Sequence, residues 1–260
     1  TGAFALDQFA YTNGQIYIDT GAAVSAAGSS NVNASVAENI ISVQLLGPEL
    51  ANSPLQQNGP LQGQSISVDV RQTGIYNGTP WIGTPLADTS GYVGLILRNV
   101  AELTTAGGSV QFNAGNSVVV KSGATIDVSG GWINYQGANV TLTQLVDTSG
   151  NIVPINQATP DRTYLGIYNP FDTKTNAKWG TVVTSTNPQL LTTFDPGYVQ
   201  GGNGGTLSIQ APSVALQGSM TGVTRSGPFQ VSSPPTPSAF SLFIAGQDLS
   251  LPSFNYPLYS

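Results

Sequence analysis

Short apolar strands that begin eight residues apart constrain the fold of this chain more than any other feature of its sequence. Between Gly107 and Gly131 the apolar residues form three pairs, each with one residue between its members: Val110 and Phe112, Val118 and Val120, and Ile126 and Val128. This period of two predicts β-strands, because successive side chains of a strand point to opposite faces of a sheet. Such spacing, with glycine or asparagine in each gap, is typical of either antiparallel hairpins or the coils of a parallel β-helix.

The gaps between these strands favour coils over hairpins. Asn113–Asn116 and Lys121–Ala124 contain glycine or asparagine, which can adopt a positive φ at a corner, and neither contains the Asn-Gly pair of a two-residue hairpin. Similar units recur at residues 15–25, 65–70 and 204–222. Three strands per coil give a repeat of about 20–25 residues, as in solenoids. We therefore expect an all-β solenoid in which stacked coils enclose a column of valine, isoleucine and leucine.

A composition poor in charge does not indicate disorder here. Only 8% of residues are charged, against about 25% in an ordinary soluble domain, but 40% are hydrophobic and gather in β-branched clusters such as Ser117–Val120. The net charge is −6, and the seven basic residues are scattered from Arg71 to Arg225. Because nucleic-acid binding needs a basic stripe that releases counterions, we expect no nucleic-acid partner.

Two regions interrupt the strand rhythm. Residues 148–200 are aromatic and marked by prolines, and we interpret them as an irregular excursion from the coils. The chain then divides into a β-helix segment at 1–227, which includes that excursion, and an extended proline-rich tail at 228–260. Within the tail, Phe240–Ile244 is a candidate last strand and Phe254–Tyr259 a candidate aromatic docking segment.

The residues that commonly carry catalysis are absent or isolated. With no histidine and no cysteine, the chain cannot form a Ser-His-Asp triad or the usual zinc sites. Some parallel β-helices are enzymes with acids on neighbouring coils, so Asp69, Asp88 and Asp127 are the acids to consider, but no Asp-Asp or Asp-x-Asp occurs. Gly201–Gly205 lacks the following aspartate of glycine-rich calcium repeats. We expect no catalytic residue, no cofactor and no metal.

Aromatic side chains are the remaining candidates for a binding site. Exposed tryptophan and tyrosine rings can stack on sugar rings, whereas buried ones fill a core. The chain has three tryptophans, Trp81, Trp132 and Trp179, and ten tyrosines. Within the excursion, Tyr164, Tyr168 and Trp179 are the candidate binding residues, with Trp179 preferred among the tryptophans, and core filling is the alternative for each.

An ordered series of short motifs extends over about residues 50–225. Its members are Ser53–Gln56, Leu61–Gly63, Gly83–Gly91, Thr105–Val110, Gly123–Gly131, Pro160–Tyr164, Ala177–Gly180 and Pro196–Val199. In this order the series resembles the large two-partner-secreted exoproteins of the filamentous-haemagglutinin type. Many solenoids share turns like Gly123–Gly131, and the order of the whole series is the more specific feature.

The resemblance implies a right-handed parallel β-helix that an outer-membrane export partner secretes to the bacterial cell surface, where it serves adhesion, surface coats or aggregation. It brings no catalytic residue with it. We therefore expect a structural, adhesive segment of a longer filament-like protein, with Thr1 at an internal cut. Expected partners are other segments or copies of the same protein and surface glycans. Two alternatives stay open: a glycan- or receptor-binding module with exposed aromatics, and a carbohydrate-active β-helix enzyme with convergent acids.

Overall fold

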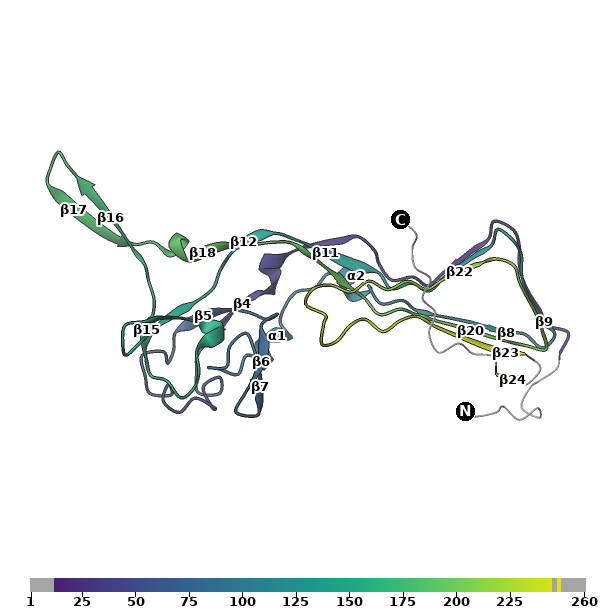
Figure 1. Ribbon diagram of the computed structural model, residues 1–260, viewed down its shortest axis with the longest axis horizontal. Helices are drawn as coiled ribbons and strands as arrows, with labels where there is room; N and C mark the ends of the chain where they lie inside the picture. Colours follow the sequence, from purple (N-terminus) through teal and green to yellow (C-terminus); the bar gives the residue numbers. More distant parts are fainter. Residues whose placement is uncertain (1–11, 245–246, 249–260) are drawn as a thin grey trace. The chain divides into compact units, whose positions relative to one another are not determined.

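The computed structural model describes residues 12–244 and 247–248 (Figure 1). Strands account for 43% and helices for 7%, which confirms the predicted all-β class, and several sheets are parallel. The chain divides into two compact units, each built from segments that are separated in the sequence. Of the described residues, the first unit takes 12–34, 98–135, 198–244 and 247–248, and the second takes Ser35–Leu97 and Gln136–Gly197.

Three sheets of parallel strands make up most of the first unit, and in each sheet successive passes of the chain lie side by side (Figure 1). The first sheet contains β1 (Gln15–Ile18), β9 (Ser117–Val120) and β21 (Ser213–Leu216). The second contains β2 (Ala23–Ser25), β10 (Thr125–Asp127) and β22 (Ser219–Thr221). The third contains β8 (Ser109–Asn113), β20 (Thr206–Ala211) and β23 (Ala239–Ile244), with β24 (Gln247–Asp248) antiparallel to β23. The strands predicted between Gly107 and Gly131 therefore pair in parallel, as expected.

The pairing is one-to-one, so equivalent side chains stack from pass to pass. Ile126 pairs with Val24 on one side and Met220 on the other. Ile126 and Val118 are both fully buried in the core of this unit. Between their strands the chain turns at Gly123, whose φ of 82° is readily adopted only by glycine. The core of the first unit is thus a column of apolar side chains, as the alternation predicts.

A further sheet lies mostly in the first unit. In it β11 (Trp132–Gln136) pairs antiparallel with β19 (Tyr198–Gly201), and β3 (Val32–Ser35) lies on the other side of β11. The rings of Tyr135 and Tyr198 stack with centroids 4.7 Å apart. The short helix α2 (Val100–Leu103) begins at a capping box. Among the described residues, no helix is long and apolar enough to cross a membrane.

The second unit is built from antiparallel strands. They are β4 (Ile40–Gln44) with β5 (Ser65–Asp69), β6 (Thr73–Tyr76) with β7 (Thr79–Ile82), β12 (Ala138–Thr141) with β18 (Thr192–Asp195), β13 (Gln144–Asp147) with both β14 (Ile152–Pro154) and β15 (Tyr164–Ile167), and β16 (Phe171–Asn176) with β17 (Thr181–Thr186). Helical turns occur at η2 (Val36–Asn39), α1 (Ser90–Val93), η3 (Ile155–Gln157) and η4 (Pro188–Leu191). Both segments of this unit supply one core, with Val43 and Leu61 from the first and Leu145 and Tyr164 from the second.

The interpretation of residues 65–70 as a coil was wrong. Their alternation does form a strand, β5, but β5 pairs antiparallel with β4 in the second unit. The chain between the two strands returns through turns, closed by backbone hydrogen bonds from Leu45 to Gln64 and from Gly63 to Leu45. Residues 45–64 fold into successive turns that return the chain to the end of β4, so β5 begins beside that end and runs back along β4 in the antiparallel direction.

The observed units also differ in extent from the predicted division. The excursion expected at 148–200 falls, as far as Gly197, within a unit that begins earlier and also takes in residues 35–97, while residues 198–200 belong to the first unit. The expected last strand, Phe240–Ile244, does form, but it pairs in parallel with β20 and so belongs to the third sheet instead of a separate tail. There Phe240 pairs with Leu207, and both are buried. The expected aromatic segment at 254–259 lies outside the described residues.

A designed disulfide tests the parallel register. Ala23 and Thr125 are exposed partners on neighbouring strands, and the chain contains no cysteine that would compete. We expect the double variant Ala23→Cys, Thr125→Cys to cross-link on mild oxidation, because Cα atoms paired across parallel strands lie about 5 Å apart, within disulfide reach. Mass spectrometry with and without reductant measures the bond.

The matched control moves one cysteine two residues along its strand. In Ala23→Cys, Asp127→Cys the extra rise of about 6.6 Å places the two Cα atoms about 8 Å apart, too far for a disulfide without backbone movement. Equal cross-linking in both variants, or none in the first, would contradict the register.

Candidate functional site

The second unit contains a pocket of about 730 Å³. Sites for small molecules typically measure about 300–1,000 Å³. Three segments line the pocket: residues 52–55 between β4 and β5, residues 76–90 of the β6–β7 hairpin and the loop after it, and Pro160–Asp161 before β15. Because these segments are far apart in the sequence, the pocket depends on the tertiary fold of this unit.

The β6–β7 hairpin supplies the aromatic part of the lining. Asn77 and Gly78 have φ values of 47° and 79°, the conformation that a two-residue type I′ hairpin requires. Tyr76 pairs with Thr79 across the hairpin. Since side chains alternate along a strand, Tyr76, Thr79 and Trp81 share one face, and all three line the pocket. The Asn-Gly pair is a strong local hairpin signal, and it was the sequence feature that could have indicated this element.

A glycine holds the Trp81 indole in place. Gly74 lies opposite Trp81 in the hairpin, and a Cβ added to Gly74 would come within 2.6 Å of the indole Cζ2. The ring therefore lies directly on the glycine backbone, a cross-strand arrangement that any larger residue would disturb. Trp81 itself is partly buried, so one face of its ring is covered and the ring retains some exposure.

Buried side-chain hydrogen bonds tie the three lining segments to one another. Each donor is fully buried and each acceptor is a backbone carbonyl: Ser53 Oγ donates to Leu86, Gln56 Nε2 to Arg162 at 2.6 Å, and Thr84 Oγ1 to Ile155 at 2.6 Å. Ser53 thus joins residues 52–55 directly to residues 76–90, whereas Gln56 and Thr84 bond to Arg162 and Ile155, which lie on either side of Pro160–Asp161 in the sequence. Opening any bridge would strand a buried polar group, which costs about 1–3 kcal/mol. The pocket is therefore preformed.

Tyr164 supports the pocket wall from inside the core. It is fully buried, and its hydroxyl oxygen accepts a hydrogen bond from the backbone N–H of Thr159 at 2.8 Å. Burial raises the pKa of Tyr164. Thr159 directly precedes Pro160 and Asp161, which line the pocket. The prediction that Tyr164 binds a ligand as an exposed ring is therefore wrong; its hydroxyl fixes a loop instead.

The other two predicted binding residues lie outside the pocket lining. Tyr168 is partly buried just after β15, and its backbone N–H donates to Gln144 at 2.8 Å. Trp179 is 72% exposed in the turn between β16 and β17, with Lys178 Nζ 5.5 Å from its ring centroid. A binding role for Tyr168 or Trp179 stays a prediction.

Two carboxylates give the pocket its charge. Hydrogen bonds from Thr159 and Tyr76 lower the pKa of Asp161, and the bond to Asp161 in turn raises the pKa of Tyr76. Hydrogen bonds from the side chain and backbone of Ser90 lower the pKa of Asp88, whose Oδ1 lies 2.9 Å from Ser90 N. Both carboxylates are thus ionised at neutral pH. Among the described residues that line the pocket there is no lysine or arginine.

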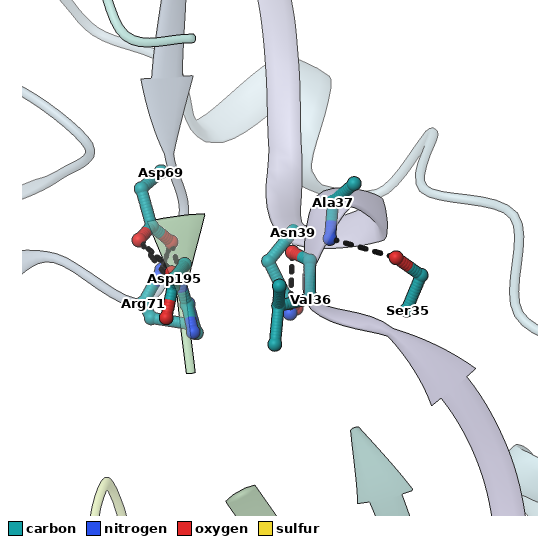
Figure 2. A network of polar contacts seen from close by, with 7 residues as sticks. All are labelled: Ser35, Val36, Ala37, Asn39, Asp69, Arg71 and Asp195. Atoms are coloured by element: carbon teal, nitrogen blue, oxygen red, sulfur yellow. Dashed lines mark hydrogen bonds and ion pairs between the residues drawn. The ribbon is translucent and has the colours of Figure 1, made fainter. Parts of the chain in front are cut away.

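A buried ionic cluster fixes the chain just before β6 (Figure 2). Arg71 donates to both carboxylate oxygens of Asp69, with Nη2 2.7 Å from Oδ2, and also contacts Asp195 at the end of β18. Burial alone would lower the pKa of Arg71, but the hydrogen bonds to Asp69 and Asp195 raise it above its ordinary value. The cluster therefore joins β5, β18 and the start of the pocket hairpin.

The other acids considered from the sequence have local structural partners. Asp69 is the buried partner of Arg71. Asp127 Oδ1 accepts a hydrogen bond from Ser129 N at 2.9 Å, as expected of an aspartate near a turn. Only Asp88 of the three lines the pocket, and it is joined there by Asp161, which the sequence did not single out.

Comparison with known proteins gives no information about the pocket, so its role is inferred from its lining residues. No family model matches the chain, and neither does any curated protein or solved structure. The resemblance to filamentous-haemagglutinin-type exoproteins thus stays a prediction based on the ordered motifs.

Replacement of Arg71 tests the ionic cluster. Arg71→Met leaves two carboxylates, one of them deeply buried, without their cation, so we expect the second unit to lose about 3–5 kcal/mol of stability in urea unfolding. Lys174→Met, at an exposed position of β16, is the control and should change stability by less than about 0.5 kcal/mol. Equal effects of the two substitutions would show that the cluster adds nothing specific.

Replacement of Gly74 tests the position of the indole. Gly74→Ala should displace the Trp81 ring and change its fluorescence, measured in a background of Trp132→Phe and Trp179→Phe so that Trp81 alone reports. Gly91→Ala is the matched control, because a Cβ there meets no atom within 4 Å and should leave the emission unchanged. An unchanged spectrum in Gly74→Ala would refute the contact.

Proposed function

We propose that the chain is a structural, adhesive segment of an extracellular bacterial filament-like surface protein, and that its first unit is a length of right-handed parallel β-helix. The observation that carries the proposal is a repeated order of strands. β8, β9 and β10 of one pass pair in the same order with β20, β21 and β22 of the next, all in parallel and residue for residue. This is the pairing expected of neighbouring coils in a solenoid.

Stacked coils suit a structural role because each coil is held by the next. The buried column of Val118, Ile126 and Ile209 contains apolar side chains whose burial depends on neighbouring passes. A stack of this kind extends by adding coils without a change of geometry. The partners in this proposal are accordingly further segments or copies of the same protein, with an outer-membrane export partner implied by the resemblance.

The chemistry of the pocket supports binding in preference to catalysis. Hydrolysis of a glycosidic bond requires one carboxyl group that stays protonated, with a raised pKa, to act as general acid. Hydrogen bonds lower the pKa of both Asp88 and Asp161, so neither fits that role. The chain also has no histidine that could replace it. We therefore propose no catalytic activity for this segment.

A second candidate function is the binding of a glycan, and the pocket is the observation that favours it. The aromatic residues concerned are Tyr76 and Trp81 of the hairpin, in place of the predicted Tyr164. Such a site on an inserted unit is compatible with an adhesive role for the whole segment.

Electron microscopy of the producing cells tests the structural proposal. Antibodies against the chain should label filaments on intact cells, because a surface solenoid is accessible without permeabilisation. An antibody against a cytoplasmic enzyme of the same cells serves as the control and should label only after permeabilisation. Label confined to permeabilised cells, or isolated globules in place of filaments, would refute the proposal, as would release of sugar from acidic polysaccharides incubated with the chain.

A further inference from the structure

We propose that the pocket of the second unit binds a neutral sugar ring, with Trp81 and Tyr76 stacking on the ring and Asp88 and Asp161 accepting hydrogen bonds from its hydroxyl groups. This inference deepens the second candidate function and is independent of the β-helix.

The aromatic residues match the apolar face of a sugar. Trp81 and Tyr76 lie on one face of the hairpin, and prolines at four positions, together with Leu55, make up much of the remaining lining. An aromatic ring has a negative face, which attracts the C–H groups of a pyranose laid against it. Because Gly74 covers one side of the indole, the opposite side is the one that a ligand can meet.

The polar residues match the edge of a sugar. Asp88 and Asp161 are ionised acceptors, and Asn52 and Asn77 add side-chain amides. A carboxylate has about four acceptor positions, so each keeps capacity beyond its bonds to Ser90 or to Thr159 and Tyr76. A ligand rich in hydroxyl donors satisfies these acceptors. Hydrogen bonds to ionised groups are about twice as strong as neutral ones.

The charge of the lining excludes anionic ligands. Two carboxylates face the pocket, while Arg162, the residue after Asp161, is not among the described residues that line it. A uronate, a sulfated sugar or a phosphate would be repelled and would find no cation there.

The hydrogen bonding of Tyr76 argues against a proline-rich peptide. Grooves that bind such peptides need donors aimed at the peptide carbonyl groups, and tyrosine hydroxyls commonly supply them. Here the nearby Asp161 carboxylate competes for the Tyr76 hydroxyl, and its interaction with that hydroxyl raises the pKa of the tyrosine. The charged groups of the pocket are thus acceptors, which fits a ligand that brings several donors.

The buried hydrogen bonds around the pocket favour the binding of a small ligand. Ser53, Gln56 and Thr84 hold the lining segments before any ligand arrives. A preformed site loses little conformational entropy when it is filled, so this part of the cost of binding is small.

Saturation-transfer NMR on the full chain tests the pocket with defined probes. The neutral probes are methyl glucoside, methyl galactoside, lactose, maltose and chitobiose. The competing classes are represented by glucuronate, argininamide and a proline-rich decapeptide. We expect saturation transfer to at least one neutral probe at about 10 mM, with binding that is insensitive to salt, and none to glucuronate.

Two tryptophan variants then locate the binding. Trp81→Ala should weaken binding of the neutral probe about tenfold or more, because aromatic anchors carry much of the energy of a small site. Trp179→Ala, which removes an exposed indole outside the pocket, should leave binding unchanged, whereas weaker binding in this variant would move the site to the β16–β17 turn and overturn the proposal. Circular dichroism of both variants checks that they fold.

Asp88→Asn keeps the proposal testable should Trp81→Ala fail to fold. Asparagine retains the Oδ1 that accepts from Ser90 N, so the turn is preserved, while loss of the charged acceptor should weaken binding about fivefold. Transfer only to argininamide or the peptide, no transfer to any neutral probe, or unchanged binding in every folded pocket variant would each overturn the proposal. The disulfide and microscopy experiments are unaffected by these outcomes, so the two proposals can fail separately.

Discussion

The hydrogen bonds between one pass of the chain and the next are the constraint on which the rest of the structure depends. Strands as short as β10 and β20 form no stable sheet alone, so each pass is held by the passes beside it. Parallel partners cannot be joined by a tight turn, because the chain must first travel back over a dozen or more residues. Here it departs at residues 35–97 and again at 136–197, far longer than a return requires, and these two departures fold together around one core. The pairing that builds the first unit therefore also creates the two insertion points from which the second is made.

Alternation predicted the strands well and their partners less well. Residues 109–127 alternate, turn at glycine or asparagine, and pair in parallel as expected. Residues 65–69 alternate equally well but pair antiparallel with β4. A period of two specifies which side chains share a face, and nothing in it specifies the partner strand. Which strand a given strand pairs with depends on the chain segment that connects them. Here the turns between β4 and β5 place β5 beside β4. The Asn77-Gly78 hairpin was not predicted, although its turn chemistry is local and could have been recognised from the sequence.

The candidate site could be predicted only in part for the same reason. Tyr164 and Leu165 are adjacent in β15, yet the tyrosine is fully buried and the leucine is 58% exposed, because neighbouring side chains of a strand point to opposite faces. Residue type alone would have given the reverse order. The pocket brings residues 52–55 and 76–90 against Pro160–Asp161, a conjunction that leaves no local motif. What the sequence did contain was Trp81 and Asp88, named among many candidates without any sign that they share a site.

The polar groups buried in the second unit distinguish its role from that of the first. The core of the first unit consists mainly of valine, isoleucine, leucine and alanine side chains, which bury apolar surface between the stacked strands. The second unit buries Ser53, Gln56 and Thr84 and the Arg71 cluster. The described part of the first unit buries fewer polar side chains, namely Glu102, Ser117 and Ser238. Replacing such groups by apolar residues of the same shape is often neutral or stabilising, so stability alone does not account for them. Directional bonds add fixed position: each holds one loop at one place relative to another. A unit that only connected two passes of the chain would not need its loops fixed in this way. A binding site does need it, because a ligand contacts several binding groups at once only when the loops that carry them are held in fixed positions.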